Sequence, residues 1–220
     1  MPDDATRPQL ADADADGDPQ LADAVRTIIG LTRTSIVDES VRAEAMTHLA
    51  RAADILGAEQ STGPYWQTGL SALEQFRLTG DPTAVFPFSP ASGLANPIAP
   101  RIALSVDAEN TVRGTVTLTE AYNGPPFDTC HGGIIALIYD DLIGMAAMVG
   151  AGGGMTARLT INYRKPTPLF RPIDIAAWFE SEDGRKFIAK GEMRCDGELL
   201  TEAEGLFIRP RGFPPGTATG

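Results

Sequence analysis

Residues 127–156 read FDTCHGGIIALIYDDLIGMAAMVGAGGGMT, and this stretch decides the fold. Its apolar run from Ile134 to Val149 has the length and the composition of a buried helix. The adjacent Asp140 and Asp141 argue against a membrane span, because each would cost about 3 kcal/mol at the centre of a bilayer. A helix that is apolar nearly all round must be covered by the rest of the chain. Two carboxylates inside it need a structural or functional reason.

Strand patterns lie on both sides of this helix. Before it, residues 101–109 and 112–120 alternate between apolar and polar side chains, which predicts a hairpin. After it, the Asp-Gly pairs at 183–184 and 196–197 are strong hairpin signals. The strand-like runs after the helix cover residues 157–165, 173–181, 186–195 and 198–210. We therefore expect an α+β fold in which an antiparallel sheet wraps around one long central helix.

The chain of 220 residues fits one main domain with an appendage. Helical spacing of apolar residues over 21–60 predicts two helices, with Asp38 as the cap of the second and Gly57 at its end. Two roles stay open for this pair: a packing arm or dimer brace, and a lid over a substrate tunnel. The expected domains are a disordered acidic tail at 1–20, a helical extension with an irregular connection at 21–99, the sheet-and-helix domain at 100–209 and a disordered tail at 210–220.

Charge and cysteine content narrow the function classes. The formal net charge of −11 argues against binding to nucleic acid and against attraction to anionic membranes. The two cysteines form neither a disulfide framework nor a metal cluster, and the acidic N-terminus lacks a signal-peptide pattern, so we expect a cytoplasmic protein without a metal. Residues 158–194 carry eight Lys or Arg against five Asp or Glu, and an anionic ligand would prefer this segment.

Several motifs occur in the order and spacing of a known family. The chain resembles the hotdog-fold thioesterases in the motifs GPPFDTCHGG, MTARLTINYRKPTPL, GRK and EAEGLFI, and in an aspartate nine residues after the histidine. The most similar branches are the PaaI-like enzymes and the mammalian long-chain acyl-CoA thioesterases. The resemblance covers about residues 100–209. It implies a hotdog fold, here with an N-terminal helical extension, and hydrolysis of acyl-CoA thioesters without a cofactor.

The resemblance also implies site residues. His131-Gly132-Gly133 matches the motif that binds the carbonyl oxygen. Asp140 matches the helix carboxylate that acts as general base or nucleophile, and Thr156 matches the hydroxyl residue that opens the next strand. Asp141 departs from the family, which often has a small residue there, so the choice between the two aspartates stays open. CoA phosphates need cations, and the candidates are Arg164, Lys165, Arg185 and Lys186. Gly132 and Asn162 are further expected substrate contacts.

Thioester hydrolysis needs a polarised carbonyl and an activated water or a nucleophile. Backbone N–H groups at a helix N-terminus supply the first, and a partly desolvated carboxylate supplies the second. Three alternatives stay open. One is a hotdog hydratase or dehydratase that pairs Asp128 with His131, the second is a nucleophilic Cys130, and the third is a non-catalytic acyl-CoA-binding protein.

Helix geometry predicts an oligomer. A helix rises about 1.5 Å per residue, so Gly132 and Asp140 of one chain lie roughly 12 Å apart along the axis. A carbonyl and the attacking water must lie within about 3.5 Å of each other. A second helix running antiparallel would set its Asp140 beside Gly133 of the first chain. We therefore expect a homodimer, or a dimer of dimers. The resemblance implies acyl-CoA as its substrate, and the net charge argues against nucleic acid and membranes as partners.

Overall fold

The computed structural model describes residues 17–58, 82, 86–125 and 127–211. The predicted tails, and most of the irregular connection before the sheet, lie largely outside these ranges. The helices are α1 (Pro19–Thr34), α2 (Glu39–Leu56), the short 3₁₀ helix η4 (Glu120–Tyr122) and α4 (Gly132–Ala151). The strands are β1 (Ile102–Val106), β2 (Val112–Thr117), β3 (Asn123–Gly124), β4 (Thr129–Cys130), β5 (Met155–Tyr163), β6 (Pro172–Asp183), β7 (Lys186–Cys195) and β8 (Glu198–Ile208).

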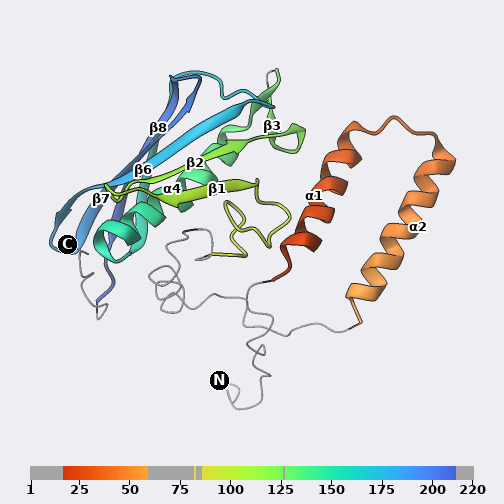
Figure 1. Ribbon diagram of the computed structural model, residues 1–220, viewed down its shortest axis with the longest axis horizontal. Helices are drawn as coiled ribbons and strands as arrows, with labels where there is room; N and C mark the ends of the chain where they lie inside the picture. The colour runs from red at the N-terminus through yellow and green to blue at the C-terminus, as the bar shows by residue number, and fades with distance from the viewer. Residues whose placement is uncertain (1–16, 59–81, 83–85, 126, 212–220) are drawn as a thin grey trace, which may run out of the picture.

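The six long strands form one antiparallel sheet in the order β1-β2-β6-β7-β8-β5. Helix α4 lies across one face of this sheet (Figure 1). The predicted order of two strands, one helix and four strands is confirmed, and both expected Asp-Gly turns connect neighbouring strands. Strand β5 begins at Met155, two residues before the predicted start, because Met155 already pairs with Ile208 of β8.

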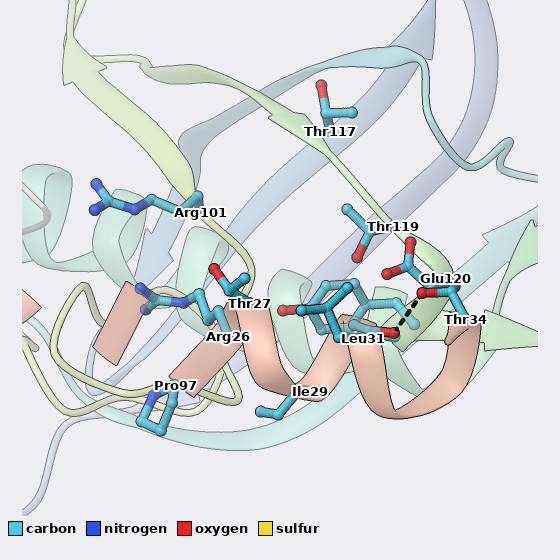
Figure 2. A pocket seen from close by; sticks show the side chains of 13 residues that line it. Arg26, Thr27, Ile29, Leu31, Thr34, Pro97, Arg101, Thr117, Thr119 and Glu120 are labelled. Atoms are coloured by element: carbon cyan, nitrogen blue, oxygen red, sulfur yellow. Dashed lines mark hydrogen bonds between the residues drawn. The ribbon is translucent and has the colours of Figure 1, made fainter. Parts of the chain in front are cut away.

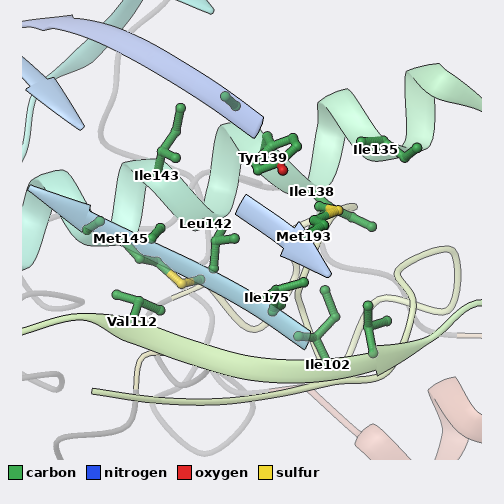
Figure 3. Packing of buried hydrophobic residues seen from close by; sticks show 14 of the residues in the cluster. Ile102, Val112, Ile135, Ile138, Tyr139, Leu142, Ile143, Met145, Ile175 and Met193 are labelled. Atoms are coloured by element: carbon green, nitrogen blue, oxygen red, sulfur yellow. The ribbon is translucent and has the colours of Figure 1, made fainter. Parts of the chain in front are cut away.

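Helix α4 and the sheet share one hydrophobic core (Figure 3). Ile138, Tyr139 and Ile143 are fully buried in it. Glycine on a facing strand lets the helix approach, since a Cβ on Gly205 would lie 2.6 Å from Ile143 Cδ1. The buried Tyr139 hydroxyl donates a hydrogen bond of 2.9 Å to the carbonyl of Thr201. Helix α4 is long and apolar enough to cross a membrane by length and composition alone, but its apolar side chains pack against the sheet.

The N-terminal extension consists of α1 and α2, which confirms the predicted pair of helices. Asp18 caps α1, so this helix begins at Pro19, inside the segment predicted to be a tail. Asp38 caps α2 and Gly57 ends it, as predicted. Ala22 is the buried residue of α1, and α2 has none. Figure 1 shows α1 beside the sheet domain and α2 on the far side of α1, and few apolar residues of either helix are buried.

Candidate active site

A short hairpin holds the N-terminus of α4. Its two strands, β3 and β4, pair Asn123 with Cys130. The N–H of His131 then donates a hydrogen bond of 2.9 Å to the carbonyl of Tyr122. Glycine is needed at position 124, because a Cβ on Gly124 would lie 2.6 Å from His131 Cα. The hairpin thus delivers His131 to the N-cap position of α4.

The His131 side chain caps the helix. The Gly133 N–H donates a hydrogen bond of 2.9 Å to His131 Nδ1, so one of the N–H groups predicted to bind the substrate carbonyl is engaged. The Gly132 N–H meets no acceptor in the described part of the chain. The Gly132 carbonyl accepts a hydrogen bond of 2.8 Å from the Tyr163 hydroxyl. The Gly132 N–H is therefore available to a ligand, at the positive end of the helix dipole.

The two aspartates of α4 have different surroundings. Asp141 is partly buried, and its carboxylate accepts hydrogen bonds from the hydroxyls of Ser89 and, at 2.6 Å, Ser92. Burial raises the pKa of Asp141, although the two serine hydrogen bonds oppose this rise. Asp140 is exposed on the side of α4 that the core leaves uncovered. Asp141 thus anchors the segment that precedes β1, while Asp140 is open to a ligand.

Strand β5 separates the predicted site residues other than Asp140 into two groups. The group at the α4 N-terminus is His131, Gly132, Gly133, Asn162, Arg164 and Lys165. The group at the opposite end of β5 is Thr156, Arg185 and Lys186. The Tyr163 contact with Gly132 fixes the first end, and Ile208, which pairs with both Met155 and Lys186, fixes the second. The seven strand steps between Thr156 and Tyr163 span roughly 23 Å, so one chain does not bring the two groups together.

The basic side chains near the α4 N-terminus have acidic neighbours. Arg164 forms an ion pair with Glu202, and Lys165 forms one with Glu198. The amide nitrogen of Asn162 lies 3.4 Å from the same Glu202 carboxylate. Exposed ion pairs of this kind are weak. A ligand phosphate can therefore compete with Glu202 and Glu198 for these cations.

The described residues contain no assembled site for a cysteine nucleophile, for an Asp128–His131 pair or for a metal ion. Cys130 is buried, which raises the pKa of its thiol to about 12, and a protonated thiol is a weak nucleophile. Asp128 is exposed, and no ion pair joins it to His131 among the described residues, where His131 Nδ1 serves the cap. Those residues also contain no group of three His, Cys, Asp or Glu side chains that could hold a metal ion.

Three site neighbours were not assigned from the sequence: Tyr163, Ser89 and Ser92. Tyr163 could have been found from its place at the end of an alternating strand, because a tyrosine hydroxyl usually forms a hydrogen bond when it is partly buried. The serines carry no such signal. Their partner, Asp141, lies 52 and 49 residues away in the chain, and only the folded structure brings them together.

The comparison with a known structure covers nearly the whole chain. A thioesterase superfamily protein of known crystal structure is 31% identical to this chain in sequence. The two structures align with a TM-score of 0.68, and the match covers 92% of this chain and 97% of the other. The chain belongs to the thioesterase superfamily. The family model of the thioesterase superfamily matches residues 127–202, which contain the N-cap, both aspartates and β5. The resemblance to hotdog-fold thioesterases, and the fold that it implies, are confirmed.

Two curated relatives match part of this chain. Acyl-coenzyme A thioesterase THEM4 of Xenopus laevis is 42% identical over 88 residues, which are 39% of this chain and 39% of the frog protein. The Mus musculus protein of the same name is 38% identical over 81 residues, 36% of this chain and 35% of the mouse protein. The chain thus spans under two fifths of the length of these relatives.

Proposed function

We propose that this chain hydrolyses acyl-CoA thioesters to a free acid and CoA. The observation that carries the proposal is the position of Asp140, an exposed carboxylate on a helix whose other face is built into the core. Such a carboxylate beside apolar surface is suited to act as a general base. The relatives that are named acyl-coenzyme A thioesterases support this class of substrate.

Two groups divide the chemistry between them. The Gly132 N–H donates a hydrogen bond to the thioester carbonyl oxygen, and the α4 dipole stabilises the negative charge that develops there. Asp140 takes a proton from water, and the resulting hydroxide attacks the carbonyl carbon. The tetrahedral intermediate then expels the CoA sulfur, which receives the proton from Asp140. The carboxylate is thereby restored for the next cycle.

The second route that Asp140 can take is direct attack on the carbonyl. The carboxylate then forms a mixed anhydride as CoA leaves, and water opens the anhydride. Isotope-labelled water in a single turnover tests for the anhydride. Label that enters the Asp140 side chain indicates an anhydride that water opens at the aspartyl carbonyl, whereas label only in the product acid fits both the general base and an anhydride opened at the acyl carbonyl.

Each site lies between two copies of the chain in this proposal. Gly132 and Asp140 of one helix are roughly 12 Å apart, and Thr156 is at the far end of β5. Strand β5 is an edge of the sheet with mostly exposed residues. Antiparallel pairing of two β5 strands would join two sheets and set the two α4 helices side by side. Asp140 and Thr156 of the second copy would then lie near Gly132 of the first.

The same arrangement supplies cations for the CoA phosphates from both copies. Arg164 and Lys165 border the α4 N-terminus of their own chain. Arg185 and Lys186 lie at the opposite end of the sheet, so those of the second copy would border the same site. For Arg164 and Lys165, the charge-assisted hydrogen bonds to phosphate oxygens would replace weak, solvent-exposed ion pairs with Glu202 and Glu198.

A screen of acyl-CoA thioesters of increasing chain length, with released thiol as the readout, tests the proposal. We expect the protein to release thiol from at least one substrate, and a matched preparation of Asp140→Asn to lose this activity. Hydration of an enoyl-CoA without thiol release would point instead to a hotdog hydratase. Tight acyl-CoA binding with no turnover would make the protein a non-catalytic binder.

A further inference from the structure

Helix α1 is held to the domain by polar contacts more than by packing. Figure 2 shows it passing beside residues 117–120, and a cavity of about 400 Å³ remains between them. Arg26 holds α1 in place of extensive apolar packing. Its guanidinium donates hydrogen bonds of 2.6–3.2 Å to four backbone carbonyls of the segment before β1. The position of α1 therefore depends on a small number of directed hydrogen bonds.

One of these contacts reaches the hairpin that carries His131. Arg33 Nη2 donates a hydrogen bond of 2.8 Å to Asn123 Oδ1. This contact fixes which way the Asn123 amide points, and its nitrogen donates to the carbonyl of Phe127 at 2.8 Å and to that of Thr129 at 3.3 Å. The helix also comes close at position 30, since a Cβ on Gly30 would lie 2.5 Å from a carboxylate oxygen of the neighbouring segment.

The hairpin loop needs such support. Phe127 has a φ of 73°, in the left-handed region that a bulky side chain rarely adopts. A residue of this kind keeps its conformation only when surrounding contacts hold it. The Asn123 amide holds the Phe127 carbonyl, and the loop runs directly into the His131 cap and the Gly132 N–H. A shift of the loop would therefore move the donor that we assign to the substrate.

A second set of contacts links α1 to the aspartate pair. The segment whose carbonyls bind Arg26 also contains Ser89 and Ser92, which hold Asp141. Asp141 is next to Asp140 on α4. Helix α1 lies outside the part of the chain that the superfamily model matches. Its contacts thus lead both to the Gly132 N–H and to the aspartate pair of α4.

We propose that α1 is a positioning element for this site, and that Arg33 is a positioning residue that acts through Asn123 on the α4 N-terminus. The inference rests on the proposed thioesterase function. It assigns a role to the N-terminal extension. Arg33 does not touch the substrate in this account, and its effect comes from the direction in which the Gly132 N–H points.

Four variants test this inference: Arg33→Ala, Arg33→Lys, Asn123→Ala and the double variant Arg33→Ala/Asn123→Ala. We expect Arg33→Ala to lower kcat by on the order of tenfold to a hundredfold, because small displacements of positioned groups slow catalysis that much. KM and the thermal midpoint should change little, since Arg33 is exposed. Arg33→Lys retains a donor and should recover part of kcat. The matched control is Arg51→Ala, an exposed arginine of α2, which should behave as wild type.

The double variant decides whether Arg33 acts through Asn123. We expect it to be no slower than Asn123→Ala alone, because residues in one chain of contacts are not additive. Multiplied losses, or a wild-type kcat in Arg33→Ala, would overturn the inference. Amide hydrogen exchange over residues 127–133 gives a readout independent of activity, and Arg33→Ala should exchange faster there. If wild type releases no thiol, the proposed function is wrong. If amide hydrogen exchange over residues 127–133 is the same in Arg33→Ala and wild type, the positioning role is wrong, whatever the outcome for the function.

Discussion

The Ser92 hydroxyl donates a hydrogen bond of 2.6 Å to the carboxylate of Asp141. This contact joins the long connection before β1 to the central helix. It also gives Asp141 different surroundings from those of Asp140, the preceding residue in the chain, which is exposed. The sequence left open which aspartate acts. The contact with Ser92 favours a structural role for Asp141 and leaves the catalytic role, as we propose, to Asp140.

The first prediction concerns pH and Asp141. Burial raises the pKa of this carboxyl in the folded protein, so its ionised form weakens the fold, and stability is lost as pH rises through the raised pKa. Asp141→Asn keeps an acceptor for Ser92 without the charge. We expect the thermal midpoint of Asp141→Asn, relative to wild type, to rise as the pH is increased above about 4, the ordinary pKa of an aspartate. A difference that does not change with pH would contradict the assignment, and Asp54→Asn, at an exposed position of α2, is the matched control.

The second prediction concerns the helix cap. Because His131 Nδ1 accepts a hydrogen bond from Gly133 N–H, His131→Ala should lose about 1 kcal/mol of unfolding free energy. His131→Asn should retain most of it, since asparagine is a good N-cap residue. Denaturant unfolding measures both, with the exposed His48→Ala as the control. Equal stability of His131→Ala and wild type would mean that the cap contributes nothing.

Much of the fold was predictable because its signals are local. The apolar run before Gly152 predicted α4, and the Asp-Gly pairs predicted two hairpins. The structure extends α4 to Gly132–Ala151, beyond the predicted apolar run, because His131 caps one end and Gly152, with a φ of 75°, closes the other. Alternation and turn residues act over a few positions, so they can be read without knowledge of the rest of the chain.

The site was less predictable because its contacts join distant segments. No sequence pattern connects Ser92 to Asp141, or Arg33 to Asn123 across 90 residues. The Gly133 N–H donates to His131 Nδ1 only in one rotamer of the His131 side chain. The spacing of residues in the sequence does not reveal that rotamer. The predicted site residues remain predictions, and the structure adds which of them share one end of the sheet.

The third prediction concerns the phosphates of CoA. Arg164 lies at the α4 N-terminus, where it pairs with half-buried Glu202. Arg164→Gln should raise KM about tenfold for an acyl-CoA, the loss expected for one charge-assisted hydrogen bond. It should leave KM nearly unchanged for a short thioester without the nucleotide. Arg171→Gln is the matched control, because Arg171 forms a similarly exposed ion pair with Asp196. Equal effects on both substrates would place Arg164 outside the CoA site.

The fourth prediction isolates the carbonyl donor. Gly132→Pro removes the N–H at the first position of the helix, where proline is well tolerated, and the preceding His131, at φ −63° and ψ 131°, has a conformation that proline permits. We expect kcat to fall by about 10²–10³. Gly132→Ala keeps the N–H, and its Cβ meets the Tyr163 ring at an ordinary 3.5 Å. If both variants lose kcat equally, the Gly132 N–H is not the donor.

The central claim is that Gly132 of one copy and Asp140 of another complete one thioesterase site. Its most direct test mixes two variants, Gly132→Pro and Asp140→Asn, each inactive alone. In a mixed dimer one site carries both lesions and the other carries neither. Random reassortment makes about half of the dimers mixed, so activity should return to about a quarter of wild type.

The measurement is thiol release from an acyl-CoA by mixed dimers, purified through a different tag on each variant after the chains are refolded together or co-expressed. The account predicts that these dimers have about half the kcat of wild-type dimers, since one of their two sites is intact. The separately refolded parent variants should stay inactive. Purified mixed dimers that release no thiol would contradict the account, because Gly132 and Asp140 would then have to act within a single chain.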